Sequence, residues 1–193
     1  MNEFQTTCLA LAKASILEEF GLSDPKTIKL EDEQFSQKRA CFVTLKMNDE
    51  LRGCIGTIIP HTKLSQDIII NAKNAAFQDP RFNPLTMYEI ENNKLTIGIT
   101  ILSPTHQKNF SNSTGLLEFL EKEHCGLIIT FGYKQATFLP SVREELPDPQ
   151  EFIFNLLNKA GITEQEFENE FSDFVFEIYY GDEFNENRKK IHG

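Results

Sequence analysis

The hexapeptide Leu51-Arg52-Gly53-Cys54-Ile55-Gly56 constrains the fold more than any other stretch of this 193-residue chain. It has the composition of a β-strand, yet two of its six residues are glycines. Glycine weakens a strand interior, because it loses more conformational freedom on folding than any other residue, and it usually marks a bulge or the close approach of another backbone. We therefore expect another element to pack closely against this strand.

The same hexapeptide carries the first candidate site. Residues of one parity share a face of a strand, so Arg52, Cys54 and Gly56 should lie together, with Gly53 on the opposite face. A guanidinium beside a thiol favours the thiolate form and attracts anions. Cys54 is then either a nucleophile or redox thiol, or a small buried hydrophobic residue, as free cysteines often are.

A nucleophilic cysteine also needs a general base within hydrogen-bond reach. His61 and His124 are the candidates, and the sequence alone brings neither close to Cys54. His124 is followed by Cys125, which invites a metal-binding interpretation. Neighbouring residues of a strand point to opposite faces, however, and no ligand set has a recognised spacing, so we expect no metal and no other cofactor.

The second candidate motif runs from Ala75 to Pro84 and has the sequence Ala-Ala-Phe-Gln-Asp-Pro-Arg-Phe-Asn-Pro. Its two prolines predict a rigid turn after a helix. Asp79 either fixes this turn, by accepting backbone amides or pairing with Arg81, or moves a proton in a reaction. Arg81 is suited to bind an anion through two hydrogen bonds, and Phe82 is a candidate ligand contact.

Charge narrows the function classes. The chain carries 29 acidic and 19 basic residues, a formal net charge of -10 and a pI near 4.9. This balance argues against binding to nucleic acid or to anionic membranes, which requires clustered Lys and Arg. From Glu144 to Glu186 there are thirteen acidic residues and only one basic residue, Lys159. That acidic surface either aids solubility or docks a basic partner.

Cysteine usage and the N-terminal sequence suggest a cytoplasmic protein. The four cysteines lie far apart and form no C-x-x-C pair, which favours reduced thiols over a disulfide framework. The first residues form no basic and apolar signal segment, and no apolar run approaches the roughly 18 residues needed to span a bilayer.

Hairpins and helices alternate without regular βαβ units, so the sequence predicts an α+β fold with a largely antiparallel sheet. The expected helices cover residues 4–20, 64–78, 114–123, 149–160 and 163–171, and the expected strands cover residues 40–47, 51–59, 94–102, 126–131, 135–139 and finally 174–180. A three-residue loop, 48–50, would pair Met47 with Leu51 and Val43 with Ile55. That register gathers the apolar residues on one face, whereas a two-residue loop would mix both faces.

Several motifs in a fixed order give the chain a resemblance to a known family. They are Phe42-Val43-Thr44-Leu45, the hexapeptide 51–56, Ala75-Ala76-Phe77, Asp79-Pro80-Arg81-Phe82, Pro84-Leu85, Leu102-Ser103-Pro104, Gly126-Leu127-Ile128-Ile129, Phe138-Leu139-Pro140-Ser141-Val142 and Lys159-Ala160-Gly161. Together they extend from about residue 4 to residue 180. In these motifs the chain resembles the AMMECR family, whose bacterial and archaeal members are called AmmeMemoRadiSam system protein A.

The resemblance has implications for fold and partners. It implies a single AMMECR-like domain over residues 1–193, with a central sheet flanked by helices in a larger lobe, a smaller lobe, and a cleft between them where Arg52, Gly53 and Cys54 lie. It implies a Memo-like protein and a radical SAM protein as partners, and it implies no particular reaction. Two functions from different classes therefore remain open: a catalytic or ligand-binding component of a multi-protein system, and a non-catalytic interaction or regulatory module.

Overall fold

The chain forms two compact units in the computed structural model, which describes residues 1–92 and 94–187. Unit 1 comprises Met1–Leu102 and the segment that begins at Asp182, and unit 2 comprises Ser103–Gly181. Each unit contains helices and one four-stranded, largely antiparallel sheet, so the fold is α+β, as the sequence predicts. The antiparallel strands form two sheets, one in each unit. The cleft expected between the lobes stays a prediction.

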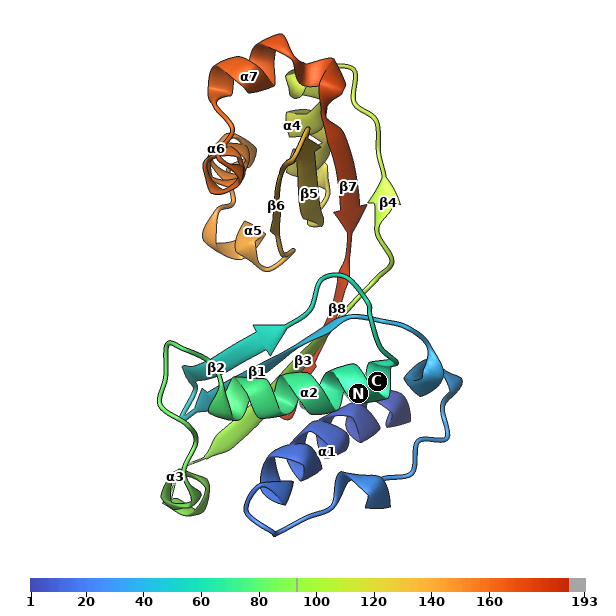
Figure 1. The fold of residues 1–193 in the computed structure, drawn as a ribbon, viewed down its shortest axis with the longest axis vertical. Coiled ribbons are helices and arrows are strands. Elements are labelled where there is room, and N and C mark those ends of the chain that lie inside the picture. The colour runs from blue at the N-terminus through green and yellow to red at the C-terminus, as the bar shows by residue number, and fades with distance from the viewer. Residues whose placement is uncertain (93, 188–193) are drawn as a thin grey trace. The chain divides into compact units, whose positions relative to one another are not determined.

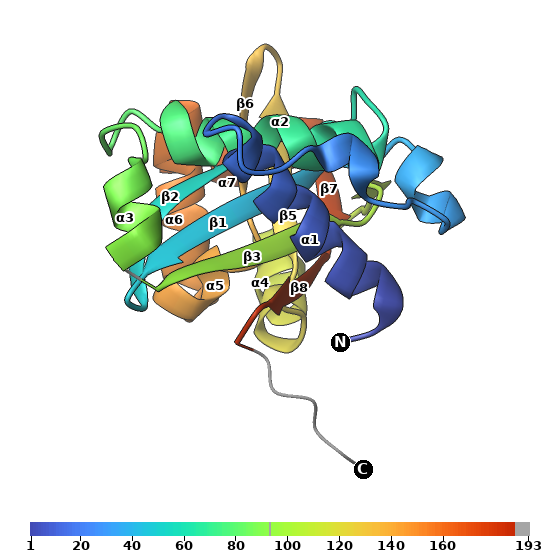
Figure 2. The ribbon, with the colours of Figure 1, turned by 90° about the horizontal axis from the view of Figure 1, so that it is seen from below.

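Unit 1 is a sheet with two long helices on one face. Its elements are α1 (Glu3–Glu18), η1 (Pro25–Thr27), η2 (Glu33–Ser36), β1 (Cys41–Met47), β2 (Glu50–Gly56), α2 (Leu64–Phe77), α3 (Met87–Asn92), β3 (Leu95–Leu102) and β8 (Gly181–Asn185). The strand order is β2-β1-β3-β8. Helices α1 and α2 lie side by side on the same face of this sheet (Figures 1 and 2).

Helix α1 begins and ends where its sequence provides caps. The side chain of Asn2 accepts a hydrogen bond from the backbone N–H of Gln5 (2.8 Å), and the side chain of Gln5 accepts one from the N–H of Asn2 (3.3 Å). This reciprocal pair satisfies two donors that a helix start leaves free. After the helix, Gly21 adopts a φ of 70°, a left-handed conformation that glycine reaches without steric cost.

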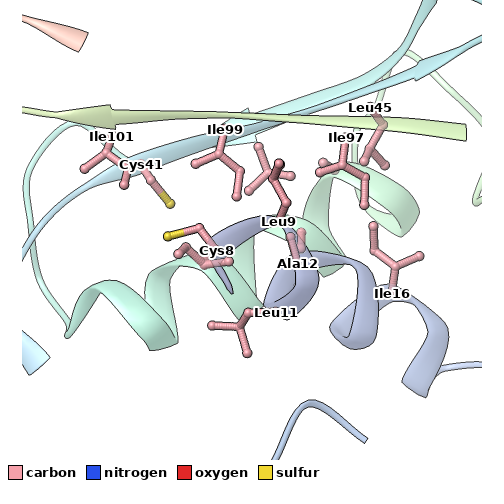
Figure 3. Packing of buried hydrophobic residues seen from close by; sticks show 14 of the residues in the cluster. Cys8, Leu9, Leu11, Ala12, Ile16, Cys41, Leu45, Ile97, Ile99 and Ile101 are labelled. Atoms are coloured by element: carbon pink, nitrogen blue, oxygen red, sulfur yellow. The ribbon is translucent and has the colours of Figure 1, made fainter. Parts of the chain in front are cut away.

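The core of unit 1 lies between these helices and the sheet (Figure 3). Its buried apolar side chains include Cys8, Leu9, Leu11, Ala12, Ile16, Cys41, Leu45, Ile97, Ile99 and Ile101. In Figure 3 the sulfur atoms of Cys8 and Cys41 point toward each other. Burial raises the pKa of Cys8 to about 12 and that of Cys41 well above its usual value. Both thiols therefore stay protonated near neutral pH.

The β1–β2 hairpin has a shorter turn than the sequence predicts. Asn48 and Asp49 form a two-residue turn with φ of 52° and 69°. Positive φ at both central positions matches a type I′ turn, whose twist suits a hairpin and which asparagine and aspartate tolerate. Met47 therefore pairs with Glu50 rather than with Leu51.

A bulge reconciles this short turn with the predicted register farther along the strands. Val43 pairs with Ile55, as predicted, but the register shifts between Leu45 and Lys46 and leaves Arg52 without a partner on β1. A bulge of this kind adds one residue to one strand and redirects side chains. Leu51 consequently lies opposite Lys46, is 45% exposed and does not join the apolar face.

Unit 2 packs four helices and a sheet around a phenylalanine-rich core. Its elements are β4 (His106–Gln107), α4 (Ser113–Lys122), β5 (Gly126–Phe131), β6 (Lys134–Phe138), α5 (Val142–Glu145), α6 (Pro149–Ala160), α7 (Glu164–Asn169), η3 (Phe171–Asp173) and β7 (Val175–Tyr179). The strand order is β4-β7-β5-β6. Buried Arg143 donates to the carbonyl oxygens of Leu120 (3.1 Å) and Leu146 (3.0 Å), which closes the ends of α4 and α5.

The sequence pattern does not predict the short elements α3, β4, α5 and β8, nor the single-turn 3₁₀ helices η1, η2 and η3. The strand expected to be the last, residues 174–180, is followed by β8, which extends the sheet of unit 1 next to β3. Strand β8 is polar and only Phe184 is buried in it, so it shows little strand periodicity. Within residues 1–92 and 94–187, no helix combines the length and apolar character that a bilayer crossing requires.

Candidate functional site

Asp79 anchors the turn that follows α2 to the strand that carries Cys54. Its carboxylate accepts the backbone N–H of Cys54 (2.9 Å) and the backbone N–H of Arg81 (3.1 Å). The guanidinium of Arg81 donates to both carboxylate oxygens, from Nε at 3.0 Å and from Nη2 at 2.7 Å, and also to the carbonyl oxygen of Cys54 at 3.2 Å. The turn therefore grips β2 through both backbone groups of Cys54.

These contacts bear on the two roles considered for Asp79. The Arg81 guanidinium, with the amides of Cys54 and Arg81, holds the pKa of the Asp79 carboxyl well below its usual range. The carboxylate is therefore ionised near neutral pH and has no proton to donate. Its contacts are those of a residue that fixes the turn.

Arg52 is held away from Cys54 by a partner that the sequence did not suggest. Its Nε and Nη2 donate to the two carboxylate oxygens of Glu89 on α3, at 2.7 Å and 3.2 Å, and Nη2 also donates to the carbonyl oxygen of Asn83 at 2.9 Å. The bulge explains this direction, because Arg52 is the extra residue of β2 and leaves the regular alternation. The cationic group that reaches the backbone of Cys54 is Arg81.

Phe82 joins the two ion pairs into one cluster. The guanidinium carbons of Arg52 and Arg81 lie over its ring, 5.8 Å and 5.5 Å from the centroid. Each arginine already has its own carboxylate, Glu89 or Asp79, so the four charges cancel. An anion would meet a neutral cluster here rather than an excess of positive charge.

The two glycines of the hexapeptide permit two close approaches, as the sequence predicts. A Cβ on Gly53 would collide with the carbonyl oxygen of Ala75 in the last turn of α2. A Cβ on Gly56 would collide with the ring of Phe42. Gly53 therefore lets the end of α2 touch β2, which positions the Asp79 turn that follows this helix.

Cys54 lies on the face of the sheet opposite α1 and α2, beside a row of hydroxyl groups. We call this surface the threonine face; it comprises Thr44, Lys46, Cys54, Thr96 and Thr100. The sulfur of Cys54 is 3.3 Å from Oγ1 of Thr44, its partner on β1. Among the four cysteines, Cys54 alone is partly exposed.

A small cavity of about 100 Å³ opens on the threonine face. It is lined by Thr44, Lys46, Asp49, Thr96, Gly98, Ile99, Thr100, Glu183, Asn185 and Asn187. Thr44 thus contacts the Cys54 thiol and also lines the cavity. Hydroxyl and amide groups dominate the lining, so the cavity can both donate and accept hydrogen bonds.

The two histidines considered as bases are not joined to Cys54 by any hydrogen bond. His61 is exposed in the loop after β2, and His124 is exposed in the loop between α4 and β5 in the other unit. Cys125 beside His124 is fully buried, so the two side chains face opposite ways. Residues 1–92 and 94–187 contain no group of three or more side chains that could hold a metal ion.

Two acidic residues near the site, Glu89 and Asp67, belong to none of the motifs that the sequence singles out. Glu89 accepts hydrogen bonds from the N–H and the hydroxyl of Thr86, so the Thr-x-x-Glu spacing of a capping box would have revealed both α3 and this residue. Asp67 is buried in the first turn of α2, where an acidic residue is ordinary because it favours the helix dipole. No pattern in the sequence marks it as buried.

The Arg52–Glu89 pair makes stability depend on pH. The Arg52 guanidinium, helped by hydrogen bonds from Thr86, lowers the pKa of Glu89 from 4.5 to about 2. A carboxyl with a depressed folded pKa contributes stability that is complete above about pH 4.5 and is lost as the pH falls through about 2. Because the Glu89 side chain is 25% exposed, screening limits this contribution to about 2 kcal/mol.

We therefore expect Glu89→Gln to lower the free energy of unfolding by about 2 kcal/mol at pH 7 and by much less at pH 3. The chain has no Trp, so urea unfolding is followed by circular dichroism at a series of pH values. The control is Glu91→Gln, at an exposed position of the same helix. Equal losses at pH 7 and pH 3 would contradict the assigned role of Glu89.

The two units and the interlocked strand and turn define a class of α+β proteins in which a glycine-flanked cysteine strand is held by an Asp-Pro-Arg turn. The AMMECR1 family model matches residues 9–180, and the chain belongs to this family.

The relatives of the chain come from archaea and bacteria. A protein of Methanosarcina barkeri is 38% identical over 150 residues, which cover 77% of this chain and 73% of that protein. A protein of Methanocaldococcus jannaschii is 32% identical over 151 residues, covering 77% and 74%. Both carry only locus names. The crystal structure of an uncharacterized protein from Pyrococcus horikoshii has a TM-score of 0.74 and 26% identity, and the match covers 97% of this chain and 93% of that one.

Proposed function

We propose that the chain is a catalytic or ligand-binding component of a multi-protein system, and that it presents the Cys54 thiol to a small polar group bound on the threonine face. The position of Cys54 carries this proposal: it is the one partly exposed cysteine, and it contacts Thr44, which lines the adjacent cavity. The family resemblance adds a Memo-like protein and a radical SAM protein as proposed partners in the cytoplasm.

The size of the cavity limits which ligands can bind in it. A volume of about 100 Å³ corresponds to roughly three water molecules at about 30 Å³ each. The cavity therefore suits the polar end group of a larger ligand better than a whole cofactor. Its lining includes both Lys46 and Asp49, so it suits a group that donates and accepts hydrogen bonds better than a strongly anionic one.

In this proposal the two halves of the site have different tasks. Three charged residues act as positioning residues. Asp79 and Arg81 hold the backbone of Cys54 on β2, and Arg52 ties β2 to Glu89 on α3. Cys54 supplies the chemistry as nucleophile or redox thiol, and Thr44 orients its sulfur.

Thiol reactivity tests this function directly. Native protein treated with iodoacetamide near pH 7.5 should take up one equivalent, located at Cys54 by mass spectrometry, because the other three thiols are fully buried. Burial also raises the pKa of Cys125 to about 11. Cys54→Ser should abolish the labelling and leave the unfolding curve unchanged. A second variant, Thr44→Val, should change the rate of alkylation, and the label should still be located at Cys54.

The outcome separates thiol chemistry from packing. An inert Cys54 in native protein, with all four cysteines labelled after denaturation, would remove the basis for a reactive thiol. Full function of Cys54→Ser in a complementation assay would likewise exclude thiol chemistry.

One observation favours a second candidate, a non-catalytic interaction module. Both arginines of the site are already paired with internal carboxylates, so the motif is well built to hold β2 and the following turn in one rigid shape. In that function Cys54→Ser would retain both co-purification with native partners and full complementation, whereas the catalytic function requires retained partners and lost complementation.

A further inference from the structure

A groove on unit 2 lies outside the site described above. It has a volume of about 280 Å³ and lies between α4, α6 and α7. Its lining consists of Ser113, Leu117, Gln150, Ile153, Phe154, Leu157, Glu164, Phe167 and Glu168. Five of these nine residues are large and apolar.

Helix α6 buries most of its apolar side chains in the core of unit 2 but leaves Phe154 exposed. Phe152 and Leu156 are fully buried in the core of unit 2. Gln150, Ile153, Phe154 and Leu157 follow the spacing of three and four residues that places side chains on one helix face, and they line the groove. Phe154 is 46% exposed whereas Ile153 and Leu157 are buried, so Phe154 is the apolar side chain of α6 that a partner can reach in this groove.

The electrostatics of unit 2 select the kind of partner. Residues 103–181 contain thirteen Asp and Glu and five Lys and Arg, a net charge of -8 out of the chain's -10. The groove lining contains two glutamates, Glu164 and Glu168, and no basic residue. Nucleic acids and anionic lipid surfaces would be repelled by this field, and a basic segment would be attracted.

The five basic residues of unit 2 are already counted in its net charge of -8, and four of them contact groups other than Glu164 and Glu168. Arg143 is buried, and Lys134 is paired with Glu166 at 2.7 Å. Lys108 and Lys159 lie over the rings of phenylalanines at 4.6 Å and 5.0 Å. The acidic rim of the groove therefore keeps its charge available to a partner.

We propose that this groove binds a basic amphipathic helix of a partner protein. Its apolar side chains, spaced by three and four residues, would fill the floor formed by Leu117, Phe154 and Phe167, and its flanking Lys or Arg would pair with Glu164 and Glu168. From Gln150 to Leu157 the groove follows eight residues of α6, a length of about 10 Å at 1.5 Å per step, so about two turns of the partner helix are held. This binding is independent of the chemistry at Cys54.

The probe is a fluorescein-labelled twelve-residue peptide with Leu at positions i, i+3, i+4 and i+7 and mainly Lys elsewhere, together with a scrambled peptide of the same composition. Binding to the full chain is measured by fluorescence anisotropy at 150 mM NaCl. The amphipathic peptide should bind at least tenfold more tightly than the scrambled one. Phe154→Ala should weaken binding about tenfold, because a central aromatic contact is lost.

A matched pair of double variants separates the groove from the overall charge. Glu164→Gln with Glu168→Gln should weaken binding about tenfold, since two ion pairs are lost. Glu144→Gln with Glu145→Gln changes the net charge by the same amount on the exposed surface of α5, outside the groove lining, and should weaken binding less than twofold. Circular dichroism confirms that each variant is folded.

Three results would overturn the proposal: equal binding of the scrambled peptide, equal weakening by the two double variants, or full binding by folded Phe154→Ala. The first two would reduce the interaction to non-specific charge attraction. The third would place the peptide elsewhere on the surface.

Discussion

Gly53→Ala is expected to destabilise the chain by about 3 kcal/mol, because the added methyl group would overlap the carbonyl oxygen of Ala75. Both collision partners belong to regular elements, β2 and the last turn of α2, so neither can move without disturbing the core between the helices and the sheet. The midpoint of thermal unfolding should fall by about 6–12 °C.

The same substitution in α4 is the matched control. A Cβ on Gly115 would meet only Oδ1 of Asn112 at 3.5 Å, an ordinary contact. Alanine is a better helix former than glycine, so Gly115→Ala should stabilise the protein by about 0.5–1 kcal/mol. If the two Gly→Ala variants change the free energy of unfolding in opposite directions, the loss in Gly53→Ala is due to the close approach of α2 and not to the loss of glycine as such. Similar small effects of both variants would contradict the packing of α2 on β2.

Gly53→Ala should also change the contacts of Cys54. The Asp79 turn directly follows α2, and its carboxylate holds the N–H of Cys54 at 2.9 Å. Moving the end of α2 away from β2 would lengthen that hydrogen bond. Folded Gly53→Ala protein should therefore also show an altered rate of Cys54 alkylation.

The sequence was sufficient to predict the hairpin core and the close approach at the glycines, because both depend on local patterns. Alternation in β1 and β2 predicts that Val43 faces Ile55, and two glycines in a strand predict a tight contact. The contact between Arg52 and Glu89 depends on a bulge. The bulge arises because a two-residue turn and the burial of one apolar face require different registers. That combination is a tertiary effect that no single window of sequence displays.

The sequence pattern does not predict elements that bury few apolar side chains, because these elements too depend on tertiary contacts. Strand β8 and helix α3 bury few or no side chains, so their hydrophobic pattern is weak. They are held by neighbours instead: β8 adds to the edge of an existing sheet, and α3 is fixed by the Thr86 capping box and by Arg52. Only the capping box could have been recognised from the sequence.

Asp67→Ala is expected to cost about 4 kcal/mol. Asp67 is 3% exposed, and its carboxylate accepts hydrogen bonds from the backbone N–H of Cys41 (2.8 Å), the hydroxyl of Thr57 (2.8 Å) and the side-chain amide of Asn71 (3.0 Å). Each buried donor left without an acceptor costs about 1–3 kcal/mol. The network joins the start of β1, the residue after β2 and helix α2, so its loss would also loosen the strand that carries Cys54.

Asp24→Ala is the control for the loss of an aspartate as such. Asp24 accepts one hydrogen bond from the N–H of Lys26 (2.8 Å) at an exposed turn, so its replacement should cost about 1 kcal/mol. Urea unfolding followed by circular dichroism measures both variants under the same conditions. A loss of 1 kcal/mol or less for Asp67→Ala would show that the network does not hold these elements together.

Asp67→Asn distinguishes the carboxylate's hydrogen bonds from its charge. Asp67 forms no ion pair with any residue in 1–92 or 94–187, so no cation would offset a negative charge buried at this position. An amide keeps one oxygen for the N–H of Cys41 and the amide of Asn71, and its NH₂ group can donate to the hydroxyl of Thr57, which accepts as readily as it donates. Asp67→Asn should therefore cost less than 1 kcal/mol. If it instead costs as much as Asp67→Ala, the negative charge itself is required, and Asp67 would have to be counted among the charged groups that act on the Cys54 strand.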